Sequence, residues 1–113
     1  MIILNGQIFT DGEVRLSATD LHAGNYHIVG VDLRNLHEVE MKLTESELKF
    51  NVPTLFLAEC VLVYIDAPQV DHLLSWISKK FPTALFVNYE QVSTYFVQVL
   101  NLFLIKGKSR NVK

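Results

Sequence analysis

Three runs in the middle of the chain are rich in β-branched and aromatic residues, which predicts strands. The runs are Tyr26–Val31, Thr54–Val63 and Ala84–Tyr89. In the second run, apolar residues occupy both faces of the predicted strand instead of one. That pattern is typical of a strand covered by helices on both faces, as in a parallel sheet.

Helical spacing of apolar residues predicts a helix after the first run. Leu36, Val39 and Leu43 lie on one face of such a helix. Asn35, with Glu38 three residues later, forms a plausible N-cap pair. Pro53 disfavours helical backbone in the residue before it and marks the return to the next strand.

A second helix is predicted between the second and third runs. Asp66 can cap it, Pro68 suits its first turn, and Pro82 ends it. The expected buried stripe consists of Val70, Leu73, Leu74, Ile77 and Phe81. His72 and Lys79 fall outside this stripe and are expected in water.

The order strand, helix, strand, helix, strand favours an α/β fold with a doubly wound parallel sheet. Residues 1–24 are poorly determined, although Asp11-Gly12 suits a hairpin turn between Gln7–Phe9 and Val14–Leu16. Residues 25–92 form the expected domain. Residues 93–113 form an apolar and then basic tail, in which Tyr95–Ile105 fits a helix or a strand equally well.

Composition narrows the class of protein. The 113 residues are 50% hydrophobic and 19% charged, enough apolar surface for a core. A net charge of −2 argues against a nucleic-acid module, which usually carries a basic excess. The one cysteine favours a reducing compartment. No secretory signal or membrane-length apolar run is visible, so a soluble, cytoplasmic protein is expected.

Acidic residues near the predicted strand ends are the strongest candidates for chemistry, because open α/β sheets bind ligands beyond the carboxyl ends of their strands. Glu59 interrupts an apolar run and needs a ligand, an internal partner or solvent. Asp32 could accept a hydrogen bond from a ribose hydroxyl, although capping the next helix is the simpler interpretation. Glu90 is expected to be solvated.

Metal, nucleophile and phosphate-loop motifs are weak. The four histidines show no i, i+4 pair, and Cys60 has no CxxC partner, which disfavours a zinc site. Cys60 is expected to be a small buried thiol. No two glycines form a GxG motif, which counts against a complete nucleotide-binding fold.

Three blocks of sequence nevertheless resemble the leucine carboxyl methyltransferase family. They are Val31-Asp32-Leu33-Arg34, Leu57-Ala-Glu-Cys-Val-Leu-Val-Tyr-Ile65 and Phe86-Val-Asn-Tyr-Glu-Gln-Val92. They occur in the family's order with compatible spacing, and the resemblance extends from about Tyr26 to Val92. A related group that modifies a wybutosine precursor in tRNA shares this domain and stays an alternative.

The resemblance implies a Rossmann-like methyltransferase that uses S-adenosylmethionine and no metal. Its substrate would be the C-terminal leucine carboxylate of the type-2A protein phosphatase catalytic subunit. The family's Asp-Leu pair, matched by Asp32 and Leu33, lies beside the adenine, and the glutamate matched by Glu59 contacts the cofactor. No nucleic acid or membrane partner is implied for this group.

The matching region corresponds to the third to fifth strands of the family's sheet. The family's glycine-rich loop and ribose-binding acid have no counterpart here, so a truncated enzyme is expected. By itself the chain is expected to be inactive and to associate through an uncovered sheet edge. Two rival interpretations are a non-catalytic interaction piece and a small receiver-like or flavodoxin-like regulator, but Asp32 lacks the acidic neighbours of a receiver.

Overall fold

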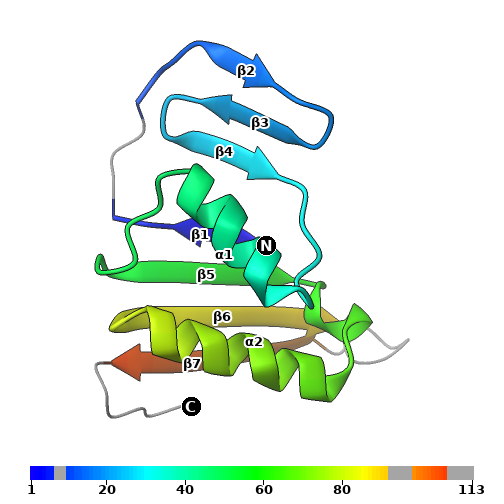
Figure 1. Cartoon of the computed structure of the whole chain (residues 1–113). Helices are drawn as coiled ribbons and strands as arrows, with labels where there is room; N and C mark the ends of the chain where they lie inside the picture. Colours follow the sequence, from blue (N-terminus) through cyan, green and yellow to red (C-terminus); the bar gives the residue numbers. More distant parts are fainter. Residues whose placement is uncertain (7–9, 92–97, 107–113) are drawn as a thin grey trace. The chain divides into compact units, whose positions relative to one another are not determined.

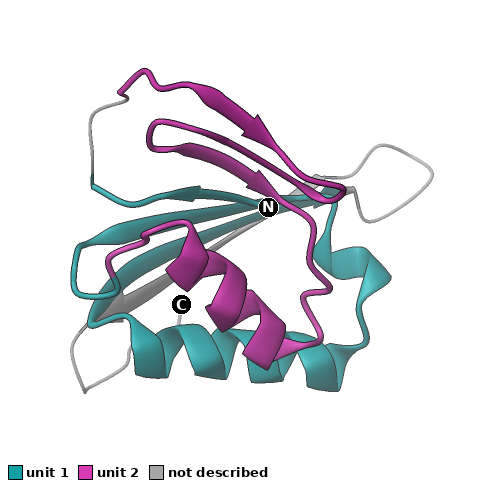
Figure 2. Cartoon of the chain, turned by 45° about the horizontal axis from the view of Figure 1, so that its top comes forward, with its two compact units in different colours: residues 1–6, 50–113 teal, residues 7–49 magenta. Residues whose placement is uncertain are grey.

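The structure, a computed structural model, describes residues 1–6, 10–91 and 98–106. The chain divides into two compact units, shown in two colours in Figure 2. One unit comprises Met1–Gly6 with Phe50–Lys113, and the other comprises Gln7–Lys49. These limits differ from the sequence-based division at residues 24 and 92. No helix in the described part of the chain is long and apolar enough to cross a membrane.

The first unit contains a four-stranded sheet in the order β1-β5-β6-β7 (Figure 1). Its strands are β1 (Ile2–Leu4), β5 (Thr54–Glu59), β6 (Thr83–Gln91) and β7 (Gln98–Lys106). Only β5 and β6 are parallel, because β1 pairs antiparallel with β5 and β7 pairs antiparallel with β6. The sheet is therefore mixed, and the expected parallel sheet is reduced to one pair. Within the apolar tail, residues 98–105 are strand, and residues 93–97 lie outside the described part.

The parallel pair is joined by a crossover that contains a short 3₁₀ turn, η1 (Leu62–Tyr64), and the helix α2 (Ala67–Lys80). The predicted strand Thr54–Val63 therefore ends at Glu59. Pro68 lies in the first turn of α2, where a missing backbone N–H costs nothing. Asp66 holds the N-cap position, but its side chain forms no capping hydrogen bond.

Aromatic side chains fill the core of this unit. Phe56, Phe81 and Phe86 are fully buried, and the Phe56 ring lies 5.0 Å from that of Phe81 and 6.0 Å from that of Phe86. Because Phe81 ends α2 and Phe56 lies on β5, these rings pack the helix against the sheet. Leu73 and Ile77 are buried with them, as the helical stripe predicts. Val70 and Leu74 are only half-buried, and His72 and Lys79 are exposed as expected.

The opposite face of the sheet is less covered than the sequence suggests. Leu55 and Leu57 on β5 are half-buried, and Leu85 on β6 is 36% exposed. Within this unit α2 packs on one face through Phe81 and Phe56, and the expectation that helices cover both faces stays a prediction. An apolar run on both strand faces shows that neither face is strongly polar, but it does not specify what covers each face.

The second unit contains a three-stranded antiparallel sheet and one helix (Figure 1). The strands are β2 (Val14–Leu16), β3 (Asp20–Ala23) and β4 (Tyr26–Val29), and the helix is α1 (Leu36–Glu45). The Asn35 side chain caps α1 by accepting a 3.1 Å hydrogen bond from the Glu38 backbone N–H, as predicted. The strand expected over Tyr26–Val31 ends at Val29 and belongs to this small sheet, not to the sheet that holds β5.

The N-terminal hairpin also differs from the prediction. β2 pairs with β3, which places Val14 opposite Ala23 and Leu16 opposite Leu21. Residues 7–9, the other half of the expected hairpin, lie outside the described residues. Alternation along these strands produces one face with exposed apolar side chains and one face with polar side chains. The exposed apolar set is Val14, Leu16, Tyr26 and Ile28.

Candidate functional site

The carboxyl end of the parallel pair β5–β6 is the first candidate site. Glu59 is the last residue of β5, and its side chain is exposed. Among the residues that the structure describes, none donates a hydrogen bond to its carboxylate. Of the three fates that the sequence left open for Glu59, the structure shows a strand end that reaches solvent. The carboxylate is therefore accessible to a ligand.

Backbone geometry turns the chain sharply after Glu59. Cys60 has a φ of 52°, in the left-handed region that non-glycine residues rarely adopt. Its backbone N–H donates a 2.8 Å hydrogen bond to the Tyr89 carbonyl on β6, which holds the turn against the neighbouring strand. The Cys60 side chain is exposed, so the expected buried thiol is wrong. Unusual backbone of this kind is concentrated at functional sites.

Two polar residues on β6 lie near the same edge: Asn88, which the sequence reasoning missed, and Glu90, which it expected in water. Asn88 is 6% exposed, and its Oδ1 atom is buried with no hydrogen-bond partner among the residues whose side chains the structure describes. Glu90 is half-buried, and its Oε1 atom is buried and unpartnered as well, so the expectation of a solvated Glu90 is wrong. Asn88 and Glu90 follow Phe86 by two and four residues. In a strand this spacing places both side chains on the same face as the buried Phe86 ring.

The strand register places these groups on the rungs next to Glu59, but on the opposite face of the sheet. Ala58 pairs with Asn88, and Glu59 pairs with Tyr89, so all of them lie within the last rungs of the parallel pair. Buried acceptor oxygens without donors are costly, and in native proteins they are rare enough to need an explanation. The end of the parallel pair therefore carries an exposed carboxylate on one face and buried acceptor oxygens on the other.

The second candidate segment is the loop that connects β4 to α1. Both carboxylate oxygens of Asp32 accept hydrogen bonds from the Arg34 guanidinium, at 2.8 to 3.3 Å. The Arg34 backbone N–H donates a further 2.9 Å bond to Asp32. These bonds hold the pKa of the Asp32 carboxyl at about 2, below its ordinary 3.8. Asp32 is therefore an anion at neutral pH, and it stabilises its own loop.

Asp32 does not cap α1, because Asn35 holds that position. The simpler interpretation of Asp32 as the helix cap is therefore wrong. Leu33, between Asp32 and Arg34, is half-buried. Asp32 and Leu33 follow β4 of the three-stranded sheet, whereas Glu59 ends β5 of the other sheet. The three predicted site residues thus do not follow neighbouring strands of one sheet, and their contacts with a cofactor stay predictions.

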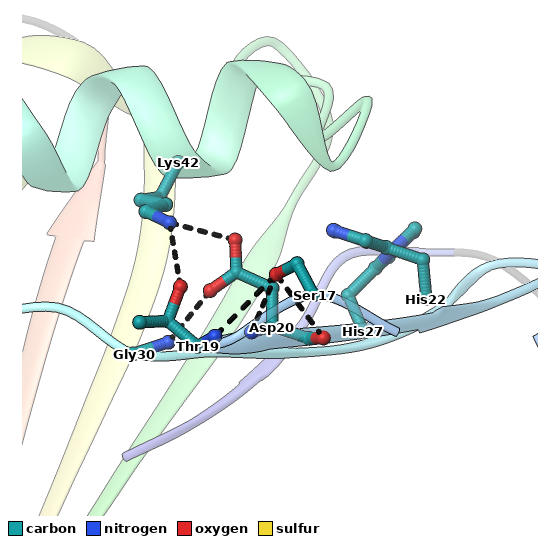
Figure 3. Close-up of polar contacts among 7 residues, drawn as sticks. All are labelled: Ser17, Thr19, Asp20, His22, His27, Gly30 and Lys42. Carbon is teal, nitrogen blue, oxygen red and sulfur yellow. Dashed lines mark hydrogen bonds and ion pairs between the residues drawn. The ribbon is translucent and has the colours of Figure 1, made fainter. Parts of the chain in front are cut away.

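A polar network ties α1 to the three-stranded sheet within the second unit (Figure 3). The Lys42 ammonium on α1 donates a 2.6 Å hydrogen bond to Asp20 on β3, and their side chains are 16% and 8% exposed. Asp20 also accepts a 3.1 Å bond from the Gly30 backbone N–H. The bond from Lys42 lowers the pKa of Asp20 to about 2. The network therefore fixes both ends of the segment that contains Asp32.

Histidines gather on the same sheet. His22 and His27 place their Nδ1 atoms 2.6 Å apart on β3 and β4. Burial, and secondarily the nearby His22, lowers the pKa of His27 below its ordinary 6.5. Within residues 1–6, 10–91 and 98–106, no group of three or more histidine, cysteine, aspartate or glutamate side chains is arranged to hold a metal ion.

These features define a mixed α/β chain whose polar groups gather at the carboxyl end of a parallel strand pair. A model of the leucine carboxyl methyltransferase family matches residues 12–78, and the chain belongs to this family of methyltransferases. It is 51% identical over 75 residues to leucine carboxyl methyltransferase 1 of Caenorhabditis elegans. That match covers 66% of this chain and 22% of the relative.

Two further relatives come from the two groups of proteins that match this chain. Leucine carboxyl methyltransferase 1 of Rattus norvegicus is 39% identical over 87 residues, which cover 77% of this chain and 26% of the relative. tRNA wybutosine-synthesizing protein 4 of Homo sapiens is 43% identical over 76 residues, which cover 67% of this chain and 11% of the relative. The chain spans about a quarter of the length of the leucine carboxyl methyltransferases that it matches.

Leucine carboxyl methyltransferases use S-adenosylmethionine, and its groups can be compared with the residues present. The cofactor carries ribose hydroxyls, an adenine amino group and an α-ammonium group, all hydrogen-bond donors. Glu59 offers an exposed carboxylate, and Asn88 offers a buried oxygen to which none of the described side chains donates. Asp32 keeps free lone pairs beside its bonds to Arg34, because a carboxylate has about four acceptor sites. The donor and acceptor chemistry of these residues therefore fits the cofactor.

Proposed function

We propose that this chain is the part of a leucine carboxyl methyltransferase that forms one side of the S-adenosylmethionine site. One observation carries the proposal: Glu59 is an exposed carboxylate at the end of a parallel strand, without a partner among the described residues, inside a segment 51% identical to such an enzyme. Ligands of open α/β sheets bind at this end of the strands. The proposal includes a Rossmann-like domain in which β5 and β6 are neighbouring parallel strands.

Three residues hold the cofactor in this proposal. Asp32 and Leu33 lie beside the adenine, and Glu59 accepts hydrogen bonds from the cofactor's donor groups. The bonds from Arg34 keep Asp32 ionised and fix its loop, so the acceptor is ordered before the cofactor arrives. Preorganised acceptors reduce the entropy that binding would otherwise cost.

The substrate is the C-terminal leucine carboxylate of the type-2A protein phosphatase catalytic subunit. When bound, S-adenosylmethionine supplies an electrophilic methyl group on a sulfonium that is its own leaving group. A carboxylate oxygen forms the new bond to this methyl carbon, the sulfur–carbon bond breaks, and no proton has to move. The protein therefore contributes mainly alignment of two reactants, an effect that can account for roughly 7–11 kcal/mol of a barrier.

The tRNA wybutosine group is the second candidate, because its human member is 43% identical over 76 residues. The net charge of −2 favours the protein substrate, since nucleic-acid sites usually carry a basic excess. A non-catalytic interaction piece is the third. The proposal also places the protein in the cytoplasm, which the single cysteine supports by favouring a reducing compartment.

A chimera tests the activity. The 75 matching residues of this chain would replace the corresponding segment of the Caenorhabditis elegans relative. We expect the chimera to transfer radiolabelled methyl groups to a peptide that ends in the phosphatase's leucine, but not to the same peptide with an amidated C-terminus. Transfer to unfractionated tRNA instead would favour the second candidate. No transfer by a folded chimera would leave the interaction piece as the better interpretation.

Variants of the chimera test the site. Glu59→Gln should weaken S-adenosylmethionine binding, measured by calorimetry, by roughly 1.5–3 kcal/mol, the scale of a hydrogen bond to a charged group. Asp71→Asn is the matched control, because Asp71 is an exposed carboxylate on α2. Equal affinities for the two variants would remove Glu59 from the cofactor site, whatever the chimera methylates.

A further inference from the structure

The polar face of the three-stranded sheet carries two histidines in direct opposition. His22 on β3 and His27 on β4 are register partners, so their side chains leave the same face of the hairpin. Their Nδ1 atoms lie 2.6 Å apart, and the ring centroids lie 4.8 Å apart at an interplanar angle of 62°. Both residues are half-buried. Two imidazole nitrogens thus converge on one point from neighbouring strands.

We propose that His22 and His27 form a two-nitrogen binding site for a divalent transition metal ion with square-planar or tetragonal preference, for which Cu²⁺ is the probe. Imidazole nitrogen is a common ligand for such ions. In the metal-free pair, one ring nitrogen donates its proton to the lone pair of the other. When the metal binds, the donating ring would carry its proton on Nε2 instead of Nδ1, so that both rings stay neutral and both Nδ1 lone pairs are available to the metal.

The nitrogen–nitrogen distance selects the geometry of the metal. With metal–nitrogen bonds of about 2.0–2.1 Å, two ligands at about 90° lie about 2.9 Å apart, whereas two at the tetrahedral angle lie about 3.3 Å apart. From 2.6 Å, the pair must open by about 0.3 Å for the square geometry and by about 0.7 Å for the tetrahedral geometry. The hairpin is therefore better matched to Cu²⁺ than to Zn²⁺.

The hairpin holds the two rings in place. A two-residue loop, Gly24-Asn25, connects the strands directly after the Ala23–Tyr26 pair. Gly24 adopts a φ of +59°, which such tight turns require and which glycine supplies without strain. The Asn25 side chain also accepts a 2.8 Å hydrogen bond from the Thr10 backbone N–H. The turn is therefore fixed on both sides, and little ordering is left for the metal to impose.

Two charged residues face the pair. Arg15 on β2 is the register partner of His22, and its positive charge opposes a cation. The negative charge of the Glu47 carboxylate has the opposite effect on His27 and favours a bound cation. Because the protein supplies only two ligands, water would complete the coordination of the metal. We therefore expect an affinity in the micromolar range, well below that of a structural site in which the protein supplies every ligand.

Titration of the full 113-residue chain with Cu²⁺ tests the site. Calorimetry should show one site, and the electron paramagnetic resonance spectrum should show coupling to two equivalent nitrogens. Replacing either ligand, by His22→Asn or His27→Asn, should weaken binding at least tenfold and remove the two-nitrogen pattern. The matched control is the double variant His37→Asn/His72→Asn, which removes two exposed histidines and should leave both readouts unchanged. Zn²⁺ should bind more weakly than Cu²⁺.

A measurement on the unmodified chain guards against variants that do not fold. Cu²⁺ at substoichiometric concentration should broaden the amide resonances of β3 and β4 before all others. Broadening centred on His37, His72 or the N-terminus would overturn the proposal. So would a His22→Asn variant that keeps the affinity and spectrum of the parent chain.

Discussion

In the unit of residues 1–6 and 50–113, five large apolar side chains are less than 2% exposed. They are Phe56, Phe81, Phe86, Leu73 and Ile77. In the described part of the other unit, residues 10–49, the buried apolar side chains are only Val39 and Leu43. There, directed polar contacts join the elements: Lys42 binds Asp20, and Asn35 caps α1. The first unit depends on apolar burial, and the second depends more on hydrogen bonds and charge.

This difference bears on where ligands can bind. The buried polar residues of the aromatic unit include Thr54, which is hydrogen-bonded, and Asn88, whose Oδ1 atom has no donor among the described residues. The second unit has polar groups throughout, so its geometry depends on protonation as well as on packing. Substitutions that remove buried apolar groups should therefore lower the unfolding free energy mainly through the first unit. Substitutions that remove charge should act mainly on the second unit.

The largest effect is expected for Phe56→Ala. Phe56 is fully buried between the rings of Phe81 and Phe86, and removing a buried phenylalanine costs roughly 3–5 kcal/mol. Urea unfolding of the whole chain measures the loss. Leu16→Ala, in the second unit, is the matched control, because Leu16 is 74% exposed and its truncation should leave the midpoint nearly unchanged. Similar losses for both would contradict the comparison.

A smaller effect distinguishes two neighbours on α2. Leu73 is 1% exposed, whereas Leu74 is half-buried. Leu73→Ala should cost roughly 2–5 kcal/mol of unfolding free energy, and Leu74→Ala should cost clearly less, because less buried surface and a smaller cavity are involved. The two variants share chemistry and helix, so the difference isolates burial. A larger loss for Leu74 would mean that the stripe is rotated by one residue.

Asn88→Leu should change stability in the opposite direction. The substitution replaces a buried oxygen, which accepts no hydrogen bond from the described part of the chain, with an apolar group of similar volume. We expect a gain of about 1–2 kcal/mol in unfolding free energy, within the cost of an unsatisfied buried polar group. If Asn88 serves a ligand, the gain in stability comes with weaker binding. A loss of stability would show that the Asn88 amide has a structural partner.

Local signals in the sequence were reliable where short-range physics decides the outcome. Asn35 with Glu38 predicted the start of α1, and Pro68 and Pro82 predicted the limits of α2, because caps and prolines act within one turn. The long-range arrangement was not predictable in this way. Tyr26–Val29 reads as a strand in any sheet, and nothing in its residues specifies an antiparallel hairpin with Asp20–Ala23.

The candidate site shows the same limit. Glu59 was found because a carboxylate in an apolar run is conspicuous, and the structure places it at an exposed strand end. Asn88 was missed because a neutral amide in a strand carries no such contrast. Its importance comes from burial and from register with Ala58, which depend on the pairing of β5 with β6. Cys60 was misjudged because its exposure follows from a left-handed backbone angle just after the strand.

The smallest effect is expected for Asp20→Asn, and it should depend on pH. The bond from Lys42 lowers the pKa of folded Asp20 from 3.8 to about 2, so its contribution to stability is present above about pH 4 and is lost as the pH falls towards 2. The same bond raises the pKa of Lys42 above 10.5, which keeps the pair ionised through neutral pH. The substituted asparagine would keep an acceptor for the Gly30 backbone N–H but lose the charge. Urea midpoints of parent and variant should therefore differ at pH 7 and converge near pH 2, whereas a constant difference would show that Asp20 acts through shape and not through charge.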